Sequence, residues 1–125
     1  MLTVKNLAVS FLNQQKTTKV IDAISFQLPK NKILGIVGES GSGKSVTSLA
    51  MMGLLDSKKT AISGEILFNN TNIISYSEKQ FQQLRGSEIA MIFQEPMSSL
   101  NPTLTCGFQV SEILAQHTAC SSKEI

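Results

Sequence analysis

The chain has 125 residues, of which 42% are hydrophobic, and this predicts one folded domain rather than a disordered segment. Eleven basic and nine acidic residues give a net charge of +2, which argues against a nucleic-acid partner. Cys106 and Cys120 form no CxxC pair, so neither a disulfide framework nor a zinc site is expected. The apolar runs are too short to span a bilayer, and residues 1–11 do not resemble a secretory signal, which predicts a cytosolic protein.

The first 31 residues have the pattern of antiparallel β structure. Apolar residues alternate with polar or small ones over residues 2–11, and a phase slip at Asn6 predicts a bulge or a break. Residues 13–18 are polar and predict a turn or loop. A second strand is expected over residues 20–28, ended by Pro29 and the polar residues after it.

From residue 32 to residue 116 the pattern changes to the beginning of an α/β core, followed by a polar tail, 117–125, expected to be frayed. Residues 32–37 are short and nearly all apolar, which predicts a strand buried on both faces. The further predictions are a helix over 44–55, a strand over 64–68, a turn at Asn69-Asn70, a short helix from Ser75 or Ser77 to Leu84, a buried strand over 89–93 and a helix over 108–116.

Residues 38–45 fit the pattern G-x-x-x-x-G-K-[ST] of the phosphate-binding P-loop. Glycines allow successive backbone N–H groups to converge on an anion, and the helix that follows points its positive end at the same place. In this pattern the lysine reaches the β- and γ-phosphates and the last hydroxyl is a ligand for Mg²⁺. The residues expected to bind the phosphates of ATP are Gly38, Ser40, Gly41, Ser42, Gly43, Lys44, Ser45 and Val46. The alternative is a flexible glycine-serine linker, which an apolar strand and an amphipathic helix would not flank.

Residues 91–102, MIFQEPMSSLNP, resemble ABC ATPases, and specifically the branch that serves dipeptide, oligopeptide and nickel importers. In that branch a strand ends in the glutamine of the Q-loop, followed by an acidic residue and then Pro-Met-x-Ser-Leu-Asn-Pro. The loop GESGSGKSV and residues 2–11 are also similar to this branch, so the resemblance runs from Leu2 to about Leu114. The implied fold is α/β: the N-terminal part of a P-loop NTPase of the ABC type, with an antiparallel β subdomain before the P-loop core.

The resemblance also implies roles for single residues. Phe11 matches the aromatic position that stacks on adenine, although it also fits an ordinary core side chain of its strand. Gln94 matches the catalytic Q-loop glutamine, which ligates Mg²⁺ and orients the attacking water; a solvated loop amide is the alternative. Val46 replaces a hydroxyl residue found in many ABC loops, and its side chain cannot donate to a phosphate, which we interpret as a trait of the branch.

The implied function is that of the ATP-binding subunit of a peptide or nickel import system, which couples ATP binding and hydrolysis to solute uptake. ATP and Mg²⁺ are the implied cofactors. The implied partners are transmembrane permease subunits and a second ATP-binding subunit, at the cytoplasmic side of the bacterial inner membrane, where this peripheral protein binds no nucleic acid.

Other parts of a working ABC ATPase do not follow Pro102: the Walker B aspartate with its glutamate, the signature Leu-Ser-Gly-Gly-Gln and the switch histidine, which His117 does not match. The alternative function is therefore a truncated, non-hydrolysing remnant that acts at most as a nucleotide-binding or interaction module. On this view we expect the isolated chain to bind nucleotide weakly and to hydrolyse it negligibly. A small P-loop kinase is disfavoured because nothing in the sequence offers a lid or an acceptor site.

Overall fold

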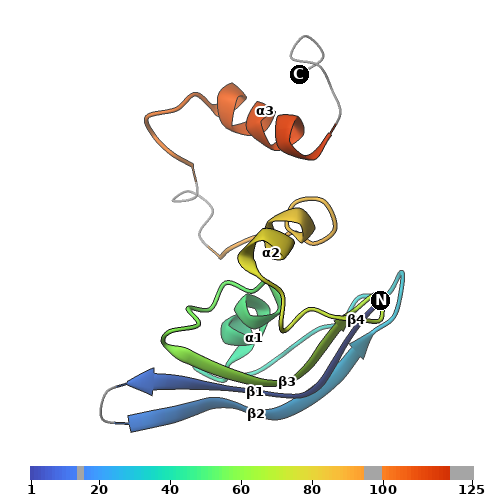
Figure 1. The fold of residues 1–125 in the computed structure, drawn as a ribbon, viewed down its shortest axis with the longest axis vertical. Helices are drawn as coiled ribbons and strands as arrows, with labels where there is room; N and C mark the ends of the chain where they lie inside the picture. The colour runs from blue at the N-terminus through green and yellow to red at the C-terminus, as the bar shows by residue number, and fades with distance from the viewer. Residues whose placement is uncertain (14–15, 95–99, 119–125) are drawn as a thin grey trace. The chain divides into compact units, whose positions relative to one another are not determined.

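The computed structural model describes residues 1–13, 16–94 and 100–118 and divides into two units, Met1–Phe81 and Gln82–Ile125. The first unit contains an antiparallel sheet with the strand order β2-β1-β3-β4. Its helix α1 (Lys44–Met51) lies over one face of this sheet (Figure 1). The strands are β1 (Leu2–Asn13), β2 (Lys16–Leu28), β3 (Thr60–Phe68) and β4 (Thr71–Asn72).

The phase slip in β1 is a β-bulge, as the sequence predicts. Lys5 pairs with Glu65 and Ala8 with Ser63, so two residues of β1 lie opposite Gly64 alone. Asn6 takes a left-handed backbone conformation, with φ of 48°. The bulge restores the inward direction of the apolar side chains, because Val4 on one side and Leu7 and Val9 on the other are all buried.

A two-residue turn connects β3 to β4, as predicted. Asn69 and Asn70 both have positive φ, 47° and 68°, and Phe68 pairs with Thr71 across them. Asparagine tolerates this left-handed conformation, and two such residues match the twist of a hairpin. The side-chain oxygen of Asn69 also accepts a hydrogen bond of 2.8 Å from the amino group of Met1.

The helix after the glycine loop is shorter than predicted: α1 ends at Met51, four residues before Leu55. Gly53 has a φ of 62°, which breaks the helical path. Its N–H donates to the carbonyl of Ala50 and the N–H of Leu54 donates to that of Leu49, at 3.1 and 2.9 Å. These two bonds form a Schellman motif, which supplies donors to carbonyl groups that have no partner within the helix at its C-terminal end.

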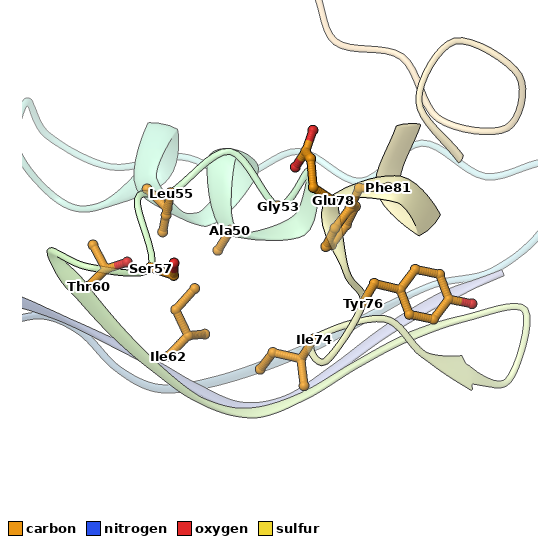
Figure 2. Close-up of a pocket in the computed structure, with 10 residues that line it drawn as sticks. All are labelled: Ala50, Gly53, Leu55, Ser57, Thr60, Ile62, Ile74, Tyr76, Glu78 and Phe81. Carbon is orange, nitrogen blue, oxygen red and sulfur yellow. The ribbon is translucent and has the colours of Figure 1, made fainter. Parts of the chain in front are cut away.

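A cavity of about 350 Å³ lies in the first unit, between the end of α1, strand β3 and the segment that leads into α2 (Glu78–Leu84) (Figure 2). Most of its lining is apolar or aromatic, including Ala50, Ile62, Ile74 and Phe81. The ring of Phe81 lies edge-on to that of Tyr76, with 5.8 Å between the centroids. None of the ten described residues that line this cavity is basic, so it has no cation for an anionic ligand.

Two of the predicted buried strands are wrong. Residues 32–37 belong to no strand, and Ile33 and Val37 are almost fully exposed. Residues 90–93 also lie outside any strand, and Ile92 is 90% exposed. A strand needs at least one hydrogen-bonding neighbour, and a parallel sheet is normally covered on both faces. Within the described residues the only parallel pairing is a single bridge between Arg85 and Ile89, so neither segment has a ladder to join.

The other differences concern strand limits and partners. The predicted polar loop over residues 13–18 is smaller than expected, because β2 already begins at Lys16. The strand predicted over residues 64–68 begins earlier, at Thr60, and it pairs antiparallel with β1.

Helix α2 begins after Ser77, one of the two predicted caps, and ends at Leu84 as expected. The side-chain oxygen of Gln80 accepts hydrogen bonds from the backbone N–H and the hydroxyl of Ser77, at 2.9 and 2.8 Å. In the second unit, α3 (Cys106–His117) begins two residues before the predicted start, and the Thr105 hydroxyl caps it by accepting from the N–H of Phe108. The predicted frayed tail lies outside the described residues from 119 onward.

Candidate phosphate-binding site

The glycine-rich loop over residues 38–43 contains a tight turn. Gly41 and Gly43 have φ of 81° and 92°, values that residues with a side chain rarely adopt. The N–H of Ser42 donates to the carbonyl of Glu39 at 3.2 Å and closes the turn. A Cβ atom on Gly38 would lie 2.6 Å from the Ser42 hydroxyl oxygen, so the start of the loop admits only glycine without a shift.

The side chain of Lys44 curls back over this turn. Its ammonium group donates to the carbonyl oxygens of Gly38 and Glu39, at 2.6 and 2.7 Å, and to the Ser42 hydroxyl at 3.3 Å. The lysine therefore links the two ends of the loop, and its charged group lies beside the turn. These three acceptors use all three donors of the ammonium group but carry no charge, so a phosphate that replaced one of them would meet an uncompensated cation.

The first turn of α1 adds a second source of positive potential. Gly43 caps the helix in a left-handed conformation, and no side chain accepts from the N–H groups at this end. The first turn also contains no acidic residue. Because the first N–H groups of a helix have no partner within the helix, they are available to a bound anion, together with the helix dipole. These features fit a phosphate group, and Ser45 lies exposed beside them.

The remaining predicted residues are placed as follows. Val46 is half-buried in the first turn of α1 and offers no side-chain donor. Phe11 lies in the last part of β1, between Thr18 and Thr60 of the neighbouring strands, and is 37% exposed. Gln94 is exposed and belongs to the second unit. Within the described residues, no group of three or more His, Cys, Asp or Glu side chains is placed to hold a metal ion.

One residue beside the loop, Thr47, is not part of the P-loop sequence pattern. The hydroxyl of Thr47 is buried and donates to the carbonyl oxygen of Gly43 at 3.0 Å. A hydroxyl residue four positions after the last glycine of a P-loop can reach that carbonyl, because residues i and i+4 are neighbours on a helix. This four-residue spacing could have identified Thr47 from the sequence.

A model of the ABC transporter family matches residues 21–123 of this chain. The chain belongs to the ABC transporter family. The match confirms the resemblance that the Q-loop segment and the glycine loop indicate. None of the helices among the described residues is both long enough and apolar enough to cross a bilayer.

The chain is also similar to curated proteins of this family that are named as peptide-transport ATP-binding proteins. The chain is 46% identical over 123 residues to the "Dipeptide transport ATP-binding protein DppD" of Haemophilus influenzae, covering 98% of this chain and 37% of that protein. It is 47% identical over 124 residues to the "Oligopeptide transport ATP-binding protein OppD" of Bacillus subtilis, covering 98% and 35%. The chain thus spans little more than a third of the length of these relatives.

Solved structures of ABC cassettes share the fold. A bacterial ABC transporter cassette solved as a dimer matches with a TM-score of 0.81 at 22% identity, over 99% of this chain and 52% of that one. The fold is therefore the N-terminal part of an ABC cassette of the α/β P-loop class, with its antiparallel β part.

Proposed function

We propose that this chain binds the triphosphate of Mg·ATP in the loop 38–45, as the ATP-binding subunit of a peptide or nickel import system. The position of Lys44 carries the proposal, because its ammonium group lies on the carbonyls of Gly38 and Glu39 at the N-terminal end of α1, where no side chain caps the helix. Backbone N–H groups and one fixed cation are what a triphosphate needs. The peptide-transport names of the relatives support the choice of solute.

The other residues of the loop complete the proposed site. Gly41 and Gly43 turn the backbone so that amide groups face the anion; Ser42 lies between these two glycines and Ser40 precedes Gly41. The Ser45 hydroxyl is the proposed protein ligand of Mg²⁺, a metal that binds through few protein oxygens and the phosphates of its nucleotide. The bound Mg²⁺ would neutralise charge on the phosphates as the terminal group is transferred to water.

Two residues outside the loop have proposed roles that rest on the family resemblance. Gln94 would add an amide oxygen to the Mg²⁺ shell and orient water, and Phe11, whose side chain is partly exposed, would stack on adenine. As in other importers of this family, the proposed partners are transmembrane permease subunits and a second ATP-binding subunit. This assembly places the chain at the cytoplasmic side of the inner membrane, as a peripheral protein.

Replacement of the loop lysine tests the phosphate site. We expect Lys44→Ala to weaken binding of Mg·ATP roughly ten- to a hundredfold, since it removes a charged hydrogen-bond donor. Titration calorimetry on the soluble chain measures this affinity, and circular dichroism checks that the variant is folded.

The matched control is Lys30→Ala, which removes the same charge from an exposed position between β2 and the loop. Its affinity for Mg·ATP should equal that of the wild type, because long-range charge contributes little across solvent. An affinity of Lys44→Ala equal to that of Lys30→Ala would remove the basis of the proposed function.

A further inference from the structure

The carbonyl group of Gly43 is held by Thr47 from inside the helix. The hydroxyl of Thr47 and its backbone N–H both donate to this one oxygen, at 3.0 and 2.8 Å. Thr47 is 3% exposed, so its hydroxyl is shielded from competing water. A hydrogen bond of this kind is stronger where water is excluded.

Gly43 is also fixed on its other side by strand β2. It is buried, and a Cβ atom built on it would lie 3.3 Å from Ile21 Cγ1 and 3.3 Å from the carbonyl oxygen of Val20. Ile21 is itself only 4% exposed and belongs to the core under α1. The last glycine of the loop therefore lies between a strand and the Thr47 side chain, with little freedom to move.

The direction of the Gly43 carbonyl decides where the next N–H points. The carbonyl of Gly43 and the N–H of Lys44 belong to one planar trans peptide, so they point in opposite directions. When Thr47 keeps the Gly43 carbonyl parallel to the helix axis, the N–H of Lys44 points away from the helix at its N-terminal end, toward the glycine loop. The same peptide also sets the starting direction of the Lys44 side chain.

The geometry points to Thr47 as a positioning residue of the phosphate site: its hydroxyl fixes the Gly43–Lys44 peptide so that the Lys44 N–H faces the bound phosphate. This inference rests on the proposed function, because it requires a phosphate at the loop. Thr47 itself makes no contact with the nucleotide. Its effect passes through the backbone of Gly43.

The test compares Thr47→Val, which exchanges the hydroxyl for a methyl group of similar shape, with a matched control. The control is Thr60→Val, because the Thr60 hydroxyl is also shielded and donates to a backbone carbonyl, that of Asp56, at 2.7 Å. Two properties are measured for each variant: the affinity for Mg·ATP by calorimetry, and hydrogen exchange of the amides of residues 47–50, which are bonded within α1, by mass spectrometry.

We expect Thr47→Val to weaken Mg·ATP binding about three- to tenfold and to speed exchange at residues 47–50, as loss of one buried hydrogen bond implies. Thr60→Val should change neither property. The pair Thr47→Ser and Thr47→Ala repeats the comparison in case the valine variant does not fold, and only the serine variant should retain tight binding.

Each outcome decides between the two proposals. If the wild type binds Mg·ATP and the Thr47 variants without a hydroxyl bind equally well, the role of Thr47 is refuted while the proposed function stands. If the wild type binds no Mg·ATP, the proposed function fails, and the role of Thr47 toward a phosphate fails with it. In that case faster exchange only in variants without the hydroxyl would show that Thr47 orders the loop alone.

Discussion

Gly64→Ala is expected to lower the free energy of unfolding by about 3 kcal/mol or more, since it combines backbone strain with overpacking. Gly64 has a φ of 100°, a conformation that L residues rarely adopt. A Cβ atom there would lie 2.4 Å from the carbonyl oxygen of Asn6 and 2.6 Å from that of Lys5. Both atoms belong to the backbone of the bulge in β1, so neither can turn away as a flexible side chain could.

Urea unfolding followed by circular dichroism measures this effect as a lower midpoint. Gly35→Ala is the matched control, because Gly35 has no positive φ and a Cβ atom there would have nothing within 4 Å. Its midpoint should stay near that of the wild type, as is usual for an exposed site. If both variants unfolded at the same urea concentration, the pairing of the bulge with Gly64 would be incorrect.

The bulge shows how far the sequence could predict the sheet. The slip at Asn6 was visible because side-chain alternation is local, and the structure confirms it. The need for glycine at position 64 could not be predicted, because it depends on which strand lies beside β1. Gly64 is 58 positions away from Asn6 along the chain, and no local pattern joins them.

The backbone geometry of the glycine loop was predictable for the opposite reason. Its glycines, Lys44 and the start of α1 are consecutive, so their geometry follows from local backbone preferences. Thr47 was missed because the P-loop pattern ends at residue 45, although the helical spacing places its hydroxyl on the Gly43 carbonyl. The pattern describes groups that touch a phosphate and leaves out the group that holds one of them in place.

The incorrect strands show where local reasoning fails. The apolar composition of residues 32–37 and 89–93 shows that each segment is suited to burial between neighbouring strands. It gives no information on whether such strands are present. In the described residues these segments have no parallel ladder, and Ile33, Val37 and Ile92 remain exposed. Burial of a strand is decided by residues elsewhere in the chain, so apolar character alone predicts the preference and not the outcome.

Gly53→Ala is the second substitution with a large expected effect, a loss of about 3 kcal/mol in the free energy of unfolding from left-handed strain and core overpacking together. Gly53 ends α1 with a φ of 62°. A Cβ atom on it would lie 2.4 to 2.6 Å from three ring carbons of Phe81. Phe81 is only 6% exposed and its ring also packs against Tyr76, so it cannot move aside without leaving the core (Figure 2).

The urea midpoint again measures the effect, and a double-mutant cycle with Phe81→Leu separates its two causes. Leucine is smaller than phenylalanine, so in that background Gly53→Ala should cost only the backbone strain, about 1 kcal/mol. Gly107→Ala serves as the control inside a helix, since nothing lies within 4 Å of a Cβ atom there and alanine favours the helix. An equal cost of Gly53→Ala in both backgrounds would mean that the ring of Phe81 does not lie against the end of α1. The strain of the left-handed residue would then account for the whole loss.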